Sequence, residues 1–270
     1  MRGTSQAARD KVLSAFDPVA IAAGKDGMAL AEQLFAAVDA LDGSGSLRRA
    51  LTDPGRDGED KASLVASLFG SYDARVVSVI SDLASARWSA GADLAAALED
   101  AGVLALLAVA QSTEVLHAVE EQLFLVEREL TSSRDLLTAL GDRSATVDGR
   151  LGVLADVLLG KVESVTYALV ARKVAAPRGV RLLDAVRGLV NLAAERSNLL
   201  VVSVTAAIEL SAAQRVRLAS ILKETYGRDM QVNVAVDPEV LGGIKIQVGS
   251  EVVDGTVVAR LADARRRLVG

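Results

Sequence analysis

Hydrophobic residues recur every three or four positions through the first two-thirds of the chain, which is the spacing of one helix face. The most regular stripe lies in an uninterrupted stretch from Gln111 to Leu130 and comprises Leu116, Val119, Leu123, Val126 and Leu130. A helix over this stretch would be roughly 30 Å long. Two segments rich in Gly and Asp, Asp42–Ser46 and Asp53–Asp60, separate successive helices. This part of the chain is therefore predicted to form packed helices.

The helical part repeats itself about ninety residues further on. The stretch QLFAAVDALDGSGSLRRALTD, which begins at Gln33, aligns without a gap with QLFLVERELTSSRDLLTALGD, which begins at Gln122, at an offset of 89. Further matches follow at an offset of 90 from Ser67–Gly70 and of 86 from Val79–Arg87, as insertions and deletions in loops would produce. Aliphatic helices also resemble one another by chance. The shared Gln-Leu-Phe and the Asp that ends both stretches favour duplication.

The pattern changes after Asn198. The β-branched run Leu199–Ile208 predicts a buried strand, and alternating hydrophobic residues in 230–238 and 243–249 predict two more. Between them, Ser211 and Gln214 form an S-x-x-Q capping box that opens a helix ending near Gly227. Asp254 is placed to cap a final helix whose stripe is Val257, Leu261, Ala264 and Leu268.

Together these patterns predict a mainly α fold in which duplicated N-terminal helical bundles precede a small C-terminal α/β domain. We expect three domains: a first helical bundle over residues 1–104, a second, repeat-related bundle over 105–197, and an α/β domain over 198–270.

Composition narrows the classes of function. Of the 270 residues, 51% are hydrophobic and only 3% are aromatic, so the core must be aliphatic. A net charge of −5 argues against a nucleic-acid-binding protein that neutralises phosphates. The chain has no cysteine, and its single histidine, His117, excludes multi-histidine metal sites. No segment reaches the ~20 apolar residues that span a bilayer, and the N-terminus lacks a signal-peptide pattern, so a soluble, cytoplasmic product is expected.

A search for chemistry finds no complete catalytic or metal motif. A phosphate-binding loop at Gly160–Val162 lacks the upstream Gly and the following Ser or Thr. A calcium loop from Asp53 lacks oxygen ligands at its third and twelfth positions. His117, like the neighbouring Glu120 and Glu121, is expected on a solvated helix surface. The cations of Arg265–Arg267 are expected to offset a helix dipole. No catalytic residue, cofactor or metal site is therefore predicted, although scattered carboxylates leave an enzyme as an open alternative.

The tail resembles the delta subunit of bacterial F-type ATP synthases, the family of the oligomycin-sensitivity-conferring protein. The resemblance is carried by VDPEVLGGIKIQVGSEVVDGTVVARL, from Val236 to Leu261, with Thr256 where Ser is common. The residues that match the family motif are Asp237, Pro238, Leu241, Gly242, Gly243, Gly249, Val253, Asp254 and Gly255. The Tyr-Ala that usually opens the first helix of the family is absent. The second bundle makes the chain similar to the enlarged delta subunits of actinobacteria.

This resemblance implies a structural role without chemistry. It implies a stator subunit that links the catalytic head to the peripheral stalk and resists the torque of the rotor during ATP synthesis and proton transport. The implied partners are the N-terminal helix of an alpha subunit, held by a helical bundle, and the b subunit of the stalk, held by the C-terminal domain. The implied location is the cytoplasmic face of the plasma membrane, without a membrane span. The alternative is a free-standing helical adaptor unrelated to ATP synthase.

Overall fold

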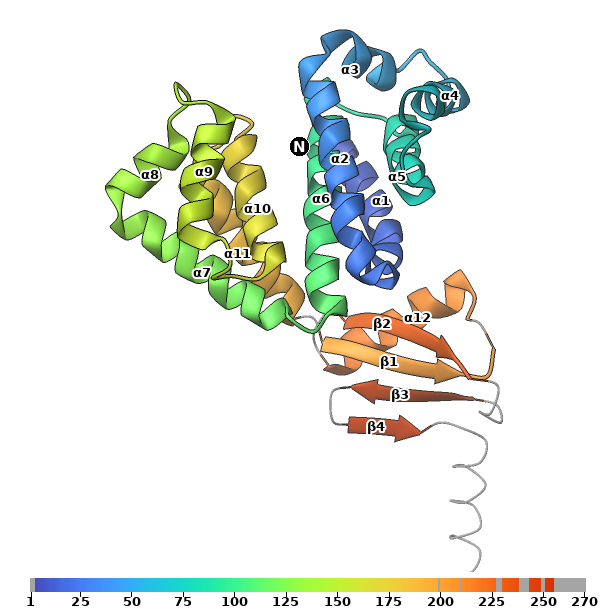
Figure 1. The fold of residues 1–270 in the computed structure, drawn as a ribbon. Coiled ribbons are helices and arrows are strands. Elements are labelled where there is room, and N and C mark those ends of the chain that lie inside the picture. The colour runs from blue at the N-terminus through green and yellow to red at the C-terminus, as the bar shows by residue number, and fades with distance from the viewer. Residues whose placement is uncertain are drawn as a thin grey trace, which may run out of the picture. The chain divides into compact units, whose positions relative to one another are not determined.

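The structure, a computed structural model, describes residues 3–198, 200–208, 210–226, 230–237, 243–248 and 251–254 (Figure 1). The chain forms two compact units, Met1–Ala194 and Glu195–Gly270. The first is helical throughout, and the second holds a small sheet. A mainly α fold with a C-terminal α/β part is thus confirmed.

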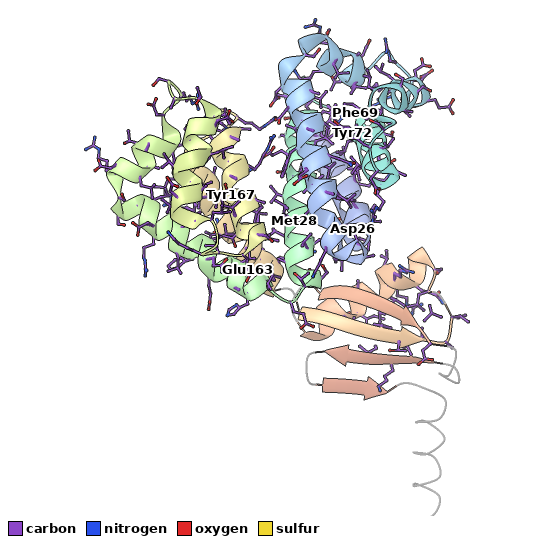
Figure 2. All side chains as sticks on the ribbon, in the orientation of Figure 1. Asp26, Met28, Phe69, Tyr72, Glu163 and Tyr167 are labelled. Atoms are coloured by element: carbon purple, nitrogen blue, oxygen red, sulfur yellow. The ribbon has the colours of Figure 1, made fainter. Side chains whose placement is uncertain are left out.

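Six helices build the first part of the helical unit. They are α1 (Gly3–Ala22), α2 (Gly27–Gly43), α3 (Gly45–Thr52), α4 (Gly58–Phe69), α5 (Ala74–Ser85) and α6 (Gly91–Ser112), with a short 3-10 turn, η1 (Gly24–Asp26), before α2. At the end of α4 the rings of Phe69 and Tyr72 lie 5.4 Å apart, where the chain turns into α5 (Figure 2).

Five further helices repeat this order. They are α7 (Leu116–Ser132), α8 (Arg134–Gly141), α9 (Val147–Leu158), α10 (Ser164–Ala175) and α11 (Leu182–Asn198). Helices α2, α3 and α4 begin at residues 27, 45 and 58, and α7, α8 and α9 begin at 116, 134 and 147, a constant separation of 89. Helices α5 and α10 begin 90 residues apart, at 74 and 164. The alignment of Val79–Arg87 at an offset of 86 was therefore wrong, because it slipped by about one helical turn.

The repeated helices also begin and end on equivalent hydrogen bonds. Ser44 and Ser133 each accept a bond at Oγ from the backbone N–H three residues on, at 3.2 and 3.3 Å, and so cap α3 and α8. Asp53 and Asp142, which follow those helices, each accept from the backbone N–H two residues on. Both repeats therefore use the same local rules for turning.

The glutamine of each Gln-Leu-Phe sequence has a structural task. Gln33 Oε1 accepts a hydrogen bond from the backbone N–H of Asp73 at 2.8 Å, and Gln122 Oε1 accepts one from Glu163 at 2.9 Å. Asp73 and Glu163 stand directly before α5 and α10. The amide of each glutamine thus ties the second helix of its repeat to the start of the fifth.

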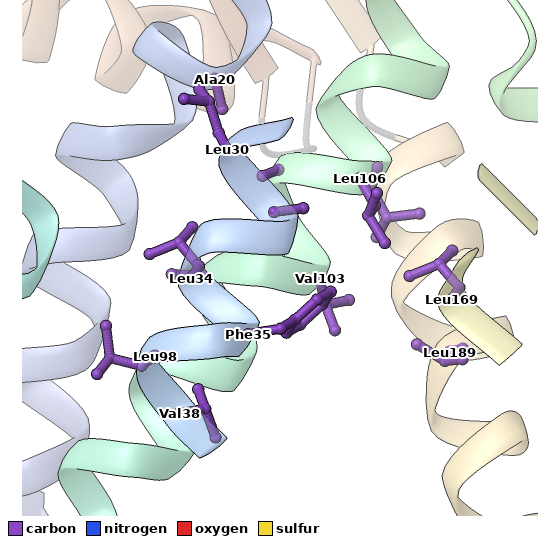
Figure 3. Close-up of a cluster of buried hydrophobic side chains, with 14 of the residues drawn as sticks. Ala20, Leu30, Leu34, Phe35, Val38, Leu98, Val103, Leu106, Leu169 and Leu189 are labelled. Carbon is purple, nitrogen blue, oxygen red and sulfur yellow. The ribbon is translucent and has the colours of Figure 1, made fainter. Parts of the chain in front are cut away.

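Helix α6 is shared between the two repeats. It ends 90 residues after α1 ends, and α7 follows it as α2 follows α1, so it is both the last helix of one repeat and the first of the next. It packs against α1 and α2 on one side and α7 and α10 on another. Such a helix must be apolar all round; Leu98, Val103 and Leu106 contribute to its part of the core (Figure 3).

Two expectations meet α6 directly. The expected domain boundary between residues 104 and 105 falls inside α6, and the helix continues without a break there. The division into two helical domains at that point therefore stays a prediction. The prediction of a single helix from Gln111 to Leu130 was wrong at its N-terminal end. The helix is interrupted between α6 and α7, where Glu114 has a φ of 61°. The predicted stripe of α7 is buried at Val119, Leu123, Val126 and Leu130.

The C-terminal unit contains a four-stranded sheet. Its strands are β1 (Leu200–Ala206), β2 (Met230–Val236), β3 (Ile244–Val248) and β4 (Glu251–Asp254), in the order β2-β1-β3-β4. Helix α12 (Ala212–Tyr226) connects the parallel pair β1 and β2, and its Leu218 and Leu222 pack with Val204. The capping box is confirmed: Ser211 and Gln214 exchange hydrogen bonds of 2.8 and 3.3 Å. Strand β4 was not predicted, and the expected helix after Asp254 lies outside the described residues.

Candidate partner-binding grooves

The residues of the C-terminal motif lie around the sheet. Asp237 follows β2, and its backbone N–H donates to the Ala206 carbonyl at 2.9 Å. Gly243 has a φ of 87°, a conformation that favours glycine, directly before β3. Asp254 is the last residue of β4. Val253 also lies in β4, opposite Ile246 of β3. The remaining motif positions, Pro238, Leu241, Gly242, Gly249 and Gly255, lie outside the described residues.

The polar residues weighed for chemistry take structural positions. His117 is 79% exposed, and its ring nitrogens face Glu120 at 3.6 Å and Glu121 at 3.4 Å on the surface of α7. Asp53 Oδ1 accepts a hydrogen bond from the Gly55 backbone N–H in the turn after α3. In the part of the chain that the structure describes, no three His, Cys, Asp or Glu side chains gather in a way that suits a metal ion. Arg265–Arg267 lie beyond the described residues.

An open apolar groove runs between α1 and α5, with a volume of about 470 Å³. We call it the first groove. Two helices line it, with Val12, Ala15, Phe16 and Val19 from α1 and Ala74, Arg75, Ser78, Val79 and Asp82 from α5. Val12 and Phe16 form its buried floor, while Ala15 and Val19 face outward. An apolar trough between two helices is a common docking site for a third helix.

The second repeat contains the equivalent groove, which we call the second groove. The residues of the α1 wall, Val12, Ala15, Phe16 and Val19, correspond at an offset of 90 to Gly102, Ala105, Leu106 and Val109 of α6. Advancing Ser78 and Asp82 by the same 90 residues gives Ala168 and Arg172 of α10. Leu106, Ala168 and Arg172 do line one hollow, of about 320 Å³. Its opposite wall is α2, which contributes Met28 (Figure 2), Ala31, Glu32, Phe35, Ala36 and Asp39.

Helix α2 packs on the α6 wall of the second groove and reaches the α10 wall through Asp39. The Phe35 ring packs on Gly102, where an added Cβ would lie 2.3 Å from ring atom Cε1 (Figure 3). Gly27 packs on Val109, where an added Cβ would lie 2.6 Å from Cγ2. Both glycines allow an approach that any side chain would block. Because of this cover Ala105 and Val109 are buried, while their counterparts Ala15 and Val19 are exposed.

A cluster of charged side chains links α10 to α6 and α2. Arg172, with a side chain only 7% exposed, pairs with Glu99 of α6 at 2.8 Å and with Asp39 of α2 at 2.9 Å. Lys173 adds a second cation 2.6 Å from Glu99. The Arg172 guanidinium also lies 4.6 Å from the centre of the Phe35 ring, a cation–π contact. A further pair joins Arg178 to Asp42 at the end of α2.

These contacts set the ionisation of the cluster. Burial alone would raise the pKa of Glu99, but hydrogen bonds from Arg172 and the charges of Lys173 and Arg172 outweigh it and hold that pKa below its ordinary value. Burial likewise disfavours the Arg172 cation, yet Glu99 and Asp39 raise its pKa. Glu99 and Arg172 thus both stay charged at neutral pH.

The first groove carries different electrostatics. Its Arg75 is bound by Asp73, which accepts at 2.7 and 2.9 Å and whose pKa these hydrogen bonds lower to about 2. Asp82, which stands where the second groove has Arg172, is exposed and forms no ion pair among the described residues. The unbalanced charge of the first groove is therefore negative.

The sequence patterns did not predict the grooves. The internal repeat was recognised only from Gln33 onward. Extending it back by 90 residues pairs Ala15 with Ala105, Phe16 with Leu106 and Val19 with Val109, which was the available signal. The ion pairs of Arg172 join residues up to 133 positions apart and left no local pattern.

The chain resembles known proteins over its full length. ATP synthase subunit delta of Beutenbergia cavernae is 45% identical over 272 residues, covering 100% of both chains. The proteins of the same name from Streptomyces coelicolor and Thermobifida fusca are 41% and 37% identical, covering 99% and 100% of this chain and 98% and 100% of their own. A chain in the cryo-EM structure of the Toxoplasma gondii mitochondrial ATP synthase hexamer aligns over 62% of this chain and 95% of its own. That alignment has 21% identity and a TM-score of 0.28, too low to support a conclusion.

The helices that the structure describes include none long and apolar enough to cross a membrane. A family model described as ATP synthase delta (OSCP) subunit matches residues 103–268, which is more than half of the chain and starts within α6. This match excludes the unrelated adaptor as an explanation. With the full-length similarity, it establishes that the chain belongs to the ATP synthase delta (OSCP) subunit family.

Proposed function

We propose that the chain is the peripheral-stalk subunit of a proton-translocating F-type ATP synthase, where it links an alpha subunit of the catalytic head to the b subunit of the stalk. It works by binding and carries no active site of its own. It is a peripheral component of a membrane-associated complex, on the cytoplasmic face of the plasma membrane. Family membership supports the stalk role, and the surfaces of the two units support the division of the partners.

The observation that carries the alpha contact is the difference between the two grooves. In the second groove the α6 wall is already packed against α2 of the same chain, whereas the α1 wall of the first groove keeps Ala15 and Val19 exposed. An amphipathic helix buries its apolar face in such a groove. We assign the N-terminal helix of the alpha subunit to the first groove. Each chain would bind the helix of one alpha subunit.

The C-terminal unit offers a separate surface for the b subunit. Its described residues include four large apolar side chains that are at least half exposed: Ile208, Val216, Ile221 and Val236. Exposed apolar side chains are candidates for contact with a partner, and α12 carries two of the four, Val216 and Ile221. The motif residues Asp237, Gly243 and Asp254 lie at the ends of β2, β3 and β4, and so support the fold of this unit.

The alpha contact is tested with a synthetic peptide of the alpha N-terminal segment from the same organism, titrated calorimetrically into the full chain. We expect one peptide per chain. The variant Val19→Glu places a carboxylate in the first groove and should weaken binding at least about tenfold, since one buried valine side chain contributes roughly 1.5–3 kcal/mol.

Val153→Glu is the matched control, because Val153 is 37% exposed on α9 and Val19 is 39% exposed on α1. Absence of peptide binding to the unmodified chain, or equal weakening by both variants, would contradict the assignment.

A further inference from the structure

The internal repeat allows the chemistry of the partner helix to be deduced from α2. The two grooves have equivalent walls, and in the second groove α2 packs on the α6 wall and forms an ion pair with the α10 wall. Where a wall residue differs between the two grooves, the partner helix of the first groove is therefore expected to differ from α2 at the side chain that faces that residue. This reasoning rests on the proposed function for the identity of the partner, and on the groove geometry alone for its chemistry.

The direction of the helix follows from two contacts. Gly27, at the start of α2, packs on Val109, and Phe35, two turns later, packs on Gly102. Residue numbers thus rise along α2 as they fall along α6, so the two helices are antiparallel. In the first groove, Val19 and Val12 take the places of Val109 and Gly102.

Gly102 indicates how large the partner's side chain can be at the position that Phe35 occupies in α2. The Phe35 ring fits only because Gly102 has no Cβ. The first groove has Val12 at this position, and Val12 is buried in the floor. A partner with a large aromatic residue there would clash with the valine, whereas a small side chain would fit.

The ion pair between Arg172 and Asp39 indicates the charge of a second side chain of the partner helix. In the second groove Arg172 binds Asp39 of α2, at 2.9 Å. In the first groove the equivalent wall residue is Asp82, whose charge has the opposite sign, and the nearby Arg75 is already neutralised by Asp73. Complementary charges across an interface fix its register and exclude wrong partners.

We infer that the helix accepted by the first groove lies antiparallel to α1, carries a small side chain where α2 carries Phe35, and carries a basic side chain where α2 carries Asp39. On the same grounds we expect the first groove to reject α2 of a second copy of this chain, because its Asp39 would face Asp82.

The first test uses peptides derived from this chain, so that it does not depend on alpha. A helix-stapled peptide of residues 27–43 carrying Phe35→Ala and Asp39→Lys is compared with the stapled natural sequence in calorimetric titrations. We expect the modified peptide to bind the full chain at least about tenfold more tightly. Equal affinities, or no binding by the modified peptide, would overturn the inference.

The second test changes the wall. Asp82→Lys should weaken the modified peptide, and the alpha N-terminal peptide, by about tenfold. Glu129→Lys is the control, since both residues lie three positions before the end of an exposed helix and change the net charge equally. Reversal of one basic residue of the alpha peptide to Glu should restore binding to Asp82→Lys. If the alpha peptide binds but ignores Asp82, the inference fails while the stalk function stands.

Orientation is tested by paramagnetic labelling, which is unambiguous because the chain has no cysteine of its own. A nitroxide on Ala22→Cys, at the exposed end of α1 outside the groove lining, should broaden NMR signals from the N-terminal half of the bound modified peptide, and one on Ala8→Cys those from its C-terminal half. The reverse pattern would show a parallel helix and contradict the inference.

Discussion

At the scale of single residues, the important side chains are the charged ones inside the helical unit. Glu99 and Arg172 have side chains that are each only 7% exposed. A buried ion pair adds little net stability by itself, but removing one member leaves an unpaired charge in the interior. The pair is thus best understood as a device that fixes how α2, α6 and α10 meet.

The depressed pKa of Glu99 predicts how stability responds to acid. A carboxylate whose pKa is lower in the folded state stabilises that state fully above its unfolded pKa of about 4.3. This contribution is lost as the pH falls through the folded-state pKa. Glu99→Gln should cost about 3 kcal/mol at pH 7 and should flatten the dependence of unfolding free energy on pH below 4.3. Urea unfolding at several pH values measures both effects, and Glu129→Gln serves as the exposed control. A variant with the unchanged acid profile would show that Glu99 is not the group responsible.

At the scale of elements, the start of α12 was predicted from its Ser211–Gln214 capping box, whereas the serine caps of α3 and α8 were not singled out. Ser44, Ser133 and the Ser211–Gln214 box act through hydrogen bonds within three residues, so their effects are written in local sequence. The shared use of α6 was not predictable from its apolar run, because periodicity does not say which neighbours bury each face. The interruption after Ser112 was not predicted, because Glu114 adopts the left-handed conformation. Glycine is the usual residue in that conformation, and there is none at this position in the sequence.

The two glutamine ties give an element-scale prediction. Gln122 Oε1 accepts from the backbone of Glu163 and also from the Thr166 hydroxyl, whereas Gln33 Oε1 accepts one bond, from Asp73. An unsatisfied donor in a partly buried place costs about 1–3 kcal/mol. Gln33→Ala should therefore destabilise the chain by about 1 kcal/mol, and Gln122→Ala by more. Chemical denaturation followed by circular dichroism measures the difference, with the exposed Gln6→Ala as reference. Equal losses would mean that the Thr166 bond contributes nothing.

At the scale of the whole molecule, the described chain divides into a helical unit and an α/β unit, each with its own hydrophobic core. This division assigns the two proposed partners to parts of the chain that fold around separate clusters. The identity of those partners came from the family motif, since neither periodicity nor composition names a binding partner.

A truncation tests this independence. A chain that ends after Asn198 retains the whole buried cluster of the helical unit and should keep its helical circular dichroism signal, its cooperative unfolding and its affinity for the alpha peptide. It should lose co-purification with the b subunit. Loss of the helical signal on truncation would show that the C-terminal unit is needed to fold the rest.

The sharing of α6 has a consequence for how the length of such chains evolves. Equivalent positions in α1 and α6 lie 90 residues apart, so an in-frame deletion between them fuses the first half of α1 to the second half of α6. The product, 180 residues long, keeps a complete set of six helices followed by the sheet, with no helix interrupted. The reverse event, an unequal crossover between two short genes, adds a repeat just as cleanly. A single recombination step thus interconverts one-bundle and two-bundle proteins, and the short form exposes the groove that α2 covers in the long one.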